Sequence, residues 1–205
     1  MPGTHEAGLA AHGFNVVAGA DEAGRGACAG PLVAAAVILP VEPIAGIADS
    51  KKLTAAAREK MFRQITERAL GCATVVVEAA EIDEIGIQRA NLDALRRALL
   101  RLDPAPQFAL IDGFGLDGLP FPSLGVWKGD QVAECVSAAS IVAKVTRDRI
   151  MDRLAQECPG YGFEVHKGYG TAAHQAALEA LGPSRAHRLS FDNVRAAMTG
   201  SVDGR

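Results

Sequence analysis

The chain has 205 residues and a formal net charge of −3, with 21 Lys and Arg against 24 Asp and Glu. Hydrophobic residues make up 49% and charged residues 22%, which excludes a disordered or fibrous chain. The net charge argues against a strong, indiscriminate nucleic-acid binder, since such domains are usually plainly basic. No apolar run approaches the roughly 20 residues that span a bilayer, and the N-terminus lacks the pattern of a signal peptide. We therefore expect a cytoplasmic protein with no membrane segment, whose length suits one domain over residues 1–205.

The four cysteines lie far apart in the sequence and form no CxxC pair; they are Cys28, Cys72, Cys135 and Cys158. A zinc site or a disulfide framework needs closer or more regular spacing. The pattern predicts reduced thiols in a cytosolic protein.

Short apolar runs bounded by turn formers are typical of strands. Such runs occur at residues 16–20, 32–39, 73–77 and 108–111. The first two are close in sequence, which favours antiparallel pairing. The last follows a helical stretch, so a crossover connection should bring it into the sheet in parallel.

Helical periodicity fills most of the remaining chain. Thr54 can cap a helix that runs to about residue 70, and residues 82–102 read as one amphipathic helix. Further helices are predicted over residues 132–154, 171–181 and 191–198. The expected fold is an α/β domain, a mixed β-sheet flanked by helices, with its core at about 15–195 and a helical C-terminal portion at about 155–200.

Acidic residues stand where the strands are expected to end. Asp21 and Glu22 close the first strand, Asp112 closes a later one, and Asp130 lies at the start of the long helix. Carboxylates at the carboxyl ends of neighbouring strands converge on one crevice. Adjacent residues of a strand point to opposite faces, so Asp21 and Glu22 reach one site only if the chain bends at this pair, as Ala23-Gly24 permits. Oxygen ligands without His or Cys suit Mg²⁺ or Mn²⁺. The alternative is that Asp21 and Asp112 only cap turns.

The loop from Gly19 to Gly26 contains several glycines and resembles a phosphate-binding loop only in part. Arg25-Gly26 stands where a P-loop needs Lys followed by Ser or Thr, and Ala29 replaces the third glycine of the dinucleotide pattern. Both a nucleotide cofactor and a P-loop phosphotransferase are therefore disfavoured. What remains is a Gly-Arg-Gly turn whose backbone can approach a ligand and whose guanidinium can meet phosphate.

Six sequence blocks, found in order between about residues 15 and 195, resemble ribonuclease HII, the type 2 ribonuclease H family. They are Asp21-Glu-Ala-Gly-Arg-Gly26 with Gly30-Pro31, Asp49-Ser-Lys-Lys-Leu53, Ile111-Asp112-Gly113, Lys128-Gly-Asp130 with Ser140-Ile-Val-Ala-Lys-Val-Thr-Arg-Asp148, His166-Lys-Gly-Tyr-Gly-Thr171 and His187-Arg-Leu-Ser-Phe191. One block arises by chance, whereas six in order are specific. The resemblance implies an RNase H-like fold, in agreement with the periodicity.

The resemblance also implies an activity. The enzyme would be an endoribonuclease that hydrolyses the RNA strand of RNA–DNA hybrids and cuts 5′ of single ribonucleotides in duplex DNA, giving 3′-hydroxyl and 5′-phosphate ends. Asp21, Glu22, Asp112 and Asp130 match the family's catalytic acids, and the first three would bind metal. Two Mg²⁺ or Mn²⁺ ions about 4 Å apart can activate water and stabilise the leaving 3′-oxygen.

Substrate recognition is implied in the same way. Gly24, Arg25 and Gly26 match the element that reads the 2′-hydroxyl, the group that distinguishes RNA from DNA. Tyr169 matches a tyrosine that stacks on the next deoxyribose, although a loop aromatic covering the core edge is the alternative. Phosphate contacts are expected from basic side chains, with Lys51 and Lys144 foremost and Lys52, Arg147, Lys167, Arg185 and Arg188 as further candidates.

Other readings remain open from the sequence. Ribonuclease HIII carries an extra N-terminal domain and a Lys in the glycine turn, whereas here about fifteen residues precede the first strand and the turn holds Arg25. A non-catalytic nucleic-acid-binding module does not require four acids, which repel phosphate. His187 is expected to be structural. We expect a monomer, and the last residues show no sliding-clamp peptide with paired aromatics.

Overall fold

The structure is a computed structural model that describes residues 4–47 and 53–200. Its chain forms two compact units. The first takes its residues from Met1–Ala23, Val33–Val75 and Leu92–Val145, and the second from Gly24–Leu32, Val76–Asn91 and Thr146–Arg205. No helix in the described ranges is long and apolar enough to cross a membrane.

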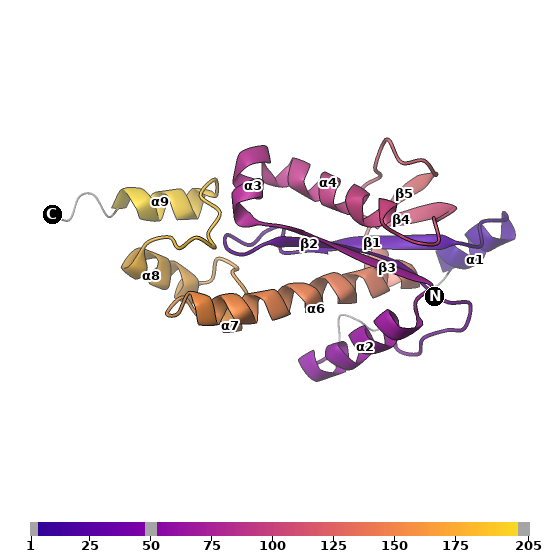
Figure 1. The fold of residues 1–205 in the computed structure, drawn as a ribbon, viewed down its shortest axis with the longest axis horizontal. Helices are drawn as coiled ribbons and strands as arrows, with labels where there is room; N and C mark the ends of the chain where they lie inside the picture. The colour runs from indigo at the N-terminus through magenta and orange to yellow at the C-terminus, as the bar shows by residue number, and fades with distance from the viewer. Residues whose placement is uncertain (1–3, 48–52, 201–205) are drawn as a thin grey trace. The chain divides into compact units, whose positions relative to one another are not determined.

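A five-stranded sheet is formed by the described residues, in the order β3-β2-β1-β4-β5 (Figure 1). The strands are β1 Val17–Ala23, β2 Leu32–Ile38, β3 Gly71–Val77, β4 Phe108–Asp112 and β5 Ser123–Val126. β1 pairs antiparallel with β2 and parallel with β4, which confirms both pairings expected from the sequence. β5 pairs parallel with β4. Every residue of β2 is buried, as its unbroken apolar run requires.

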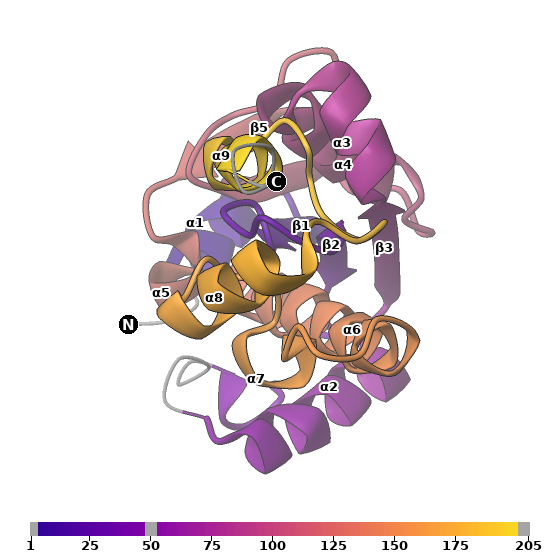
Figure 2. The same ribbon diagram turned by 90° about the vertical axis from the view of Figure 1, so that its left-hand side faces the viewer.

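Helices of the first unit cover both faces of this sheet. α2 Ala55–Arg68 and the first half of α6 Glu134–Glu157 lie on one face, and the later part of α4 Ile87–Leu100 lies on the other (Figures 1 and 2). Thr54 caps α2, since its Oγ1 accepts a hydrogen bond of 3.2 Å from the Ala57 N–H. α1 Thr4–Ala11 and the four-residue α5 Gly129–Val132 complete the helices of this unit.

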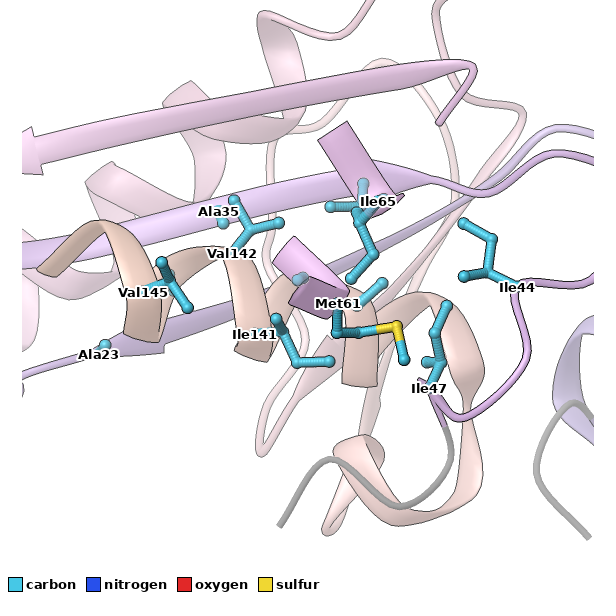
Figure 3. Close-up of a cluster of buried hydrophobic side chains, with 13 residues drawn as sticks. Ala23, Ala35, Ile44, Ile47, Met61, Ile65, Ile141, Val142 and Val145 are labelled. Carbon is cyan, nitrogen blue, oxygen red and sulfur yellow. The ribbon is translucent and has the colours of Figure 1, made fainter. Parts of the chain in front are cut away.

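A core cluster of the first unit joins the sheet to α2 and α6 (Figure 3). Alanines from the strands and from α6 pack here against larger aliphatic side chains, and burial of this apolar surface stabilises the unit. The side chains that meet here include Ala23, Ala35, Val37, Met61, Ile65, Ile141, Val142 and Val145.

The second unit is mainly helical (Figure 2). It contains α3 Ala79–Ile85, α7 Phe163–His166, α8 Ala172–Leu181 and α9 Asp192–Gly200, together with the ends of α4 and α6. Tyr161 and Phe163 stack with their ring centroids 5.3 Å apart and pack on Met151 of α6. These helices confirm the helical C-terminal portion.

The structure differs from the sequence-based expectation in several elements. The single helix expected over 82–102 is two helices, α3 and α4, because Gly86 adopts φ +80°, which an α-helix does not accommodate. β1 continues to Ala23, so it includes the acidic pair instead of ending before it. α1, α7 and β5 were not expected. Asp130 lies in α5, which precedes the long helix α6.

Candidate active site

The strand register brings two of the expected acids together at the end of the sheet. Ala20 of β1 pairs with Ile111 of β4, so Asp21 and Asp112, the next residue on each parallel strand, are neighbours. Asp21 is only 7% exposed. Pairing of β1 with β2 continues to Ala23, which keeps Asp21 and Glu22 in extended backbone. The expected bend therefore comes later than Glu22, at Gly24, where φ is +88°.

Asp112 also fixes the segment that carries Asp130. Its Oδ1 accepts a hydrogen bond of 2.7 Å from the N–H of Gly129, the first residue of α5. The first N–H groups of a helix have no intrahelical partner, so this carboxylate satisfies one of them. Asp130 follows directly and is 7% exposed. Asp112 at the end of β4 and Asp130 in α5 thus lie on two elements that are hydrogen-bonded to each other.

Close packing of α6 on β1 completes the surroundings of Asp21. A Cβ at Gly19 would lie 2.1 Å from the carbonyl carbon of Cys135, so only glycine allows this approach. Further along α6, the hydroxyl of Ser140 hydrogen-bonds the Asp21 carboxyl group. Lys144 lies four residues after Ser140 and hence on the same face of the helix. Ser140 stands in one of the sequence motifs, but no sequence signal indicated this role.

The electrostatics of this cluster favour a bound cation. Burial, followed by the charges of Glu22 and Asp112, raises the pKa of Asp21 from 3.8 to about 8, although hydrogen bonds from Ser140 and from the Glu22 N–H oppose the rise. Without a cation, Asp21 therefore stays protonated at neutral pH. The donors are carboxylate oxygens, which fit Mg²⁺ or Mn²⁺. In the described ranges, the side chains form no ready-made group of three or more His, Cys, Asp or Glu that could hold a metal ion.

The glycine turn belongs to the second unit. Gly24 O accepts a hydrogen bond of 3.3 Å from Ala27 N, which makes Arg25 and Gly26 the central residues of a β-turn. Arg25 Nη2 donates to Gln88 Oε1 at 2.6 Å, a contact that no sequence signal indicated. A Cβ at Gly26 would meet nothing within 4 Å. Of the two glycines, it is therefore Gly26 that leaves open space for a ligand.

Tyr169 lies in a loop that is hydrogen-bonded to the segment following the turn. The N–H groups of Cys28 and Ala29 donate to Gly168 O at 3.0 and 3.2 Å. A Cβ at Gly168 would lie 2.2 Å from Ala29 O, so the two backbones approach as closely as glycine allows. Tyr169 is 39% exposed, and its ring centroid lies 5.4 Å from the guanidinium carbon of Arg147.

The expected phosphate contacts fare differently. Lys51 lies outside the described residues, as does Lys52, and Lys144 is half-buried on α6. For two of the further candidates, Arg147 and Arg188, the expectation of a phosphate contact is wrong. Both side chains are fully buried and donate to backbone carbonyls, so they are not surface phosphate contacts. Sequence alone does not separate a buried arginine from an exposed one. Lys167 and Arg185 pair with Asp152 and Glu157.

His187 has the structural surroundings expected for it. It is 2% exposed, its Nδ1 accepts from Ser184 N at 2.9 Å, and its Nε2 lies 3.1 Å from His174 Nε2. Burial, with a smaller contribution from His174, lowers the pKa of His187 to about 4. His187 therefore stays neutral at physiological pH and serves as a packed, hydrogen-bonded residue.

Comparison with known proteins decides the family. The family model described as ribonuclease HII matches residues 18–194. The chain belongs to the ribonuclease HII family. Ribonuclease HII of Cutibacterium acnes is 59% identical over 196 residues, which cover 94% of this chain and 96% of that protein. Among solved structures, ribonuclease H2 from Pyrococcus horikoshii OT3 matches with a TM-score of 0.81 and 30% identity, covering 90% of this chain and 97% of that one.

A second solved relative is the ribonuclease HII found in complex with PCNA from Archaeoglobus fulgidus. It matches with a TM-score of 0.73 and 26% identity, and the match covers 86% of this chain and 95% of that one. Together these matches confirm the RNase H-like fold and favour ribonuclease HII over the ribonuclease HIII and non-catalytic alternatives. As a member of this family, the chain is a divalent-metal-dependent hydrolase, an RNase H endonuclease that acts on RNA–DNA hybrids.

Proposed function

We propose that this enzyme also cuts duplex DNA on the 5′ side of a single embedded ribonucleotide and leaves 3′-hydroxyl and 5′-phosphate ends, so that it serves ribonucleotide removal from DNA. The observation that carries the hydrolytic part is the neighbouring pair Asp21 and Asp112, at the ends of two parallel strands, with the pKa of Asp21 raised to about 8. Such a carboxylate cluster is suited to holding dications against a phosphodiester.

Asp21, Glu22 and Asp112 would hold two divalent cations, Mg²⁺ or Mn²⁺, with Asp130 as the fourth catalytic acid. When bound, these cations lower the pKa of an attacking water and stabilise the leaving 3′-oxygen. Ser140 and the Glu22 N–H hold the carboxyl group of Asp21, and the Gly129 N–H holds one oxygen of Asp112. These bonds anchor both carboxyl groups at the ends of their strands, from which the side chains would turn to hold the cations.

The second unit would read the sugar. The exposed backbone at Gly26 can approach a 2′-hydroxyl without a side chain in the way, and Gly24 and Arg25 belong to the same turn. Tyr169 would stack on the deoxyribose that follows, where a second 2′-hydroxyl would clash. Lys144 and Lys51 would contact the phosphates that position the strand.

The test uses three duplexes of one sequence: all DNA, DNA with one ribonucleotide, and an RNA–DNA hybrid. With Mg²⁺ or Mn²⁺ we expect a cut 5′ of the single ribonucleotide, cleavage of the hybrid and no cleavage of all-DNA duplex. EDTA should abolish every cut. Cleavage of the hybrid with none at the single ribonucleotide would leave the family activity intact and overturn the proposed substrate.

A further inference from the structure

Two arginines of the second unit are buried in an unusual way. Arg147 on α6 and Arg188 after α8 are both 0% exposed, and neither forms an ion pair with a described carboxylate. One guanidinium nitrogen of Arg188, Nη2, has no hydrogen-bond partner among the described residues. Burying a cation without a bonded counter-charge costs folding free energy, so a pair of such residues needs an explanation beyond stability.

Both guanidiniums bind the backbone that follows β1. Arg147 and Arg188 together donate to four carbonyls of this segment and to one in the tyrosine loop. The bonds are Arg147 Nε to Pro31 O at 2.9 Å, Nη2 to Ala29 O at 3.1 Å and Nη1 to Lys167 O at 2.8 Å, with Arg188 Nε to Gly30 O at 3.0 Å and Nη1 to Arg25 O at 3.1 Å. We call Arg147 and Arg188 the arginine bracket.

We propose that the arginine bracket positions the glycine turn and Tyr169 and thereby sets selection for a ribonucleotide followed by a deoxynucleotide. This inference rests on the proposed function of the turn and the tyrosine. Arg147 links the two elements directly, because one guanidinium binds Ala29 O on one side and Lys167 O on the other while the Tyr169 ring packs on it. Lysine could not make these bonds from one planar group.

The bracket also determines which backbone groups the turn offers to a ligand. The carbonyl oxygens of Arg25 and of residues 29–31 accept hydrogen bonds from the two guanidiniums. The Gly26 N–H donates to no group in the described part of the chain, and the space beside Gly26 is open. The turn therefore presents a donor to a sugar oxygen, beside two buried positive charges that favour an approaching phosphate.

Gly24 provides independent support for the bracket. A Cβ at Gly24 would lie 1.9 Å from Arg147 Nε, and φ there is +88°. Only glycine fits at position 24, because the Arg147 side chain packs where a Cβ would lie, whereas Gly26 has no such neighbour. We expect Gly24→Ala to displace Arg147 and to reproduce the effect of changing that arginine.

The test compares Arg147→Lys and Arg188→Lys with Arg153→Lys, a matched control at an exposed arginine of α6. Wild-type enzyme must first cut the single-ribonucleotide duplex; if it does not, the proposed function fails before the bracket is tested. Circular dichroism and thermal unfolding identify the folded variants. For these, KM and kcat are measured on the single-ribonucleotide duplex and on the RNA–DNA hybrid.

We expect each bracket variant to raise KM for the single-ribonucleotide duplex about tenfold or more, since small misplacements of binding groups are costly, and to lower the preference for it over the hybrid. Arg153→Lys should match wild type. A folded Arg147→Lys or Arg188→Lys variant with unchanged KM and unchanged preference would overturn the proposal. Such a result would mean that the arginine contributes only to stability, because destabilisation lowers the folded fraction but leaves the KM of the folded molecules unchanged. If neither folds, hydrogen exchange of the wild type decides. Amides of residues 24–31 and 167–171 should then open together, and independent opening would contradict the bracket.

Discussion

Asp21→Asn should stabilise the metal-free enzyme at high pH while abolishing its activity. Asp21 is buried beside Glu22 and Asp112, and its pKa is raised to about 8. The native state therefore keeps a proton that the unfolded chain releases near pH 4, so stability is greatest at low pH and is lost as pH rises towards 8. Asparagine has a similar shape, carries no charge and can still accept from the Glu22 N–H.

The size of the effect follows from the two pKa values. The pKa of Asp21 is 3.8 in the unfolded chain and about 8 in the native state. Between about pH 5 and pH 9, this difference lowers the free energy of unfolding over roughly three pH units, which is about 4 kcal/mol at 1.36 kcal/mol per unit. Urea unfolding in EDTA at both pH values measures it. Wild type should lose about that much more stability than Asp21→Asn, because all other groups titrate in both proteins.

Metal provides the internal control for this experiment. A cation that binds only the native state stabilises it by mass action, so excess Mg²⁺ should restore wild-type stability at pH 9 and have little effect on Asp21→Asn. Parallel pH profiles for the two proteins in EDTA would refute the reasoning. They would mean that Asp21 is not held protonated by burial and its acidic neighbours.

Four further outcomes are expected. Asp112→Asn should fold and lose most activity at saturating metal, with a milder loss for Asp130→Asn; near-normal kcat for Asp112→Asn would remove it from the ligand set. Tyr169→Ala should lose more kcat/KM on a single-ribonucleotide duplex than on an RNA–DNA hybrid, and equal losses would make it a packing residue. Gly26→Ala should keep the wild-type melting temperature, because the space beside it is open, yet raise KM for ribonucleotide substrates; unchanged KM would show that no sugar approaches there. Because the pKa of His187 is lowered to about 4, stability should be full above about pH 6.5 and fall towards pH 4, and His187→Asn should weaken this dependence in urea unfolding.

Most of the fold was readable from the sequence because its signals are local. The apolar run of β2 and the Thr54 cap of α2 depend only on neighbouring residues, and both predictions are confirmed. β5 was not predicted because Gly125 weakens the strand pattern of its sequence. Only a tertiary contact explains this glycine, since a Cβ there would lie 2.4 Å from the backbone of Phe114. The end of β1 was placed too early because pairing with β2, a non-local interaction, extends it to Ala23.

The geometry of the candidate site was predictable only in part. Acids at strand ends pointed to Asp21 and Asp112, and the parallel register then brings them together. Arg147 was expected on the surface, because nothing in a sequence distinguishes a guanidinium that binds carbonyl oxygens from one that binds phosphate. Its burial depends on glycines distant in the chain, such as Gly24, whose missing side chain leaves room for it.

The chemistry of the cut ends is the most direct test of the central claim that this site hydrolyses the phosphodiester with metal-activated water. A duplex carrying one ribonucleotide, labelled at both ends, is cleaved by wild type with Mg²⁺ and by Asp112→Asn as control. We expect one wild-type cut, 5′ of the ribonucleotide, with a 3′-hydroxyl that a polymerase extends and a 5′-phosphate that a ligase joins. A 2′,3′-cyclic phosphate, or equal cutting by Asp112→Asn, would contradict the account, since attack would then come from the 2′-hydroxyl or from another site.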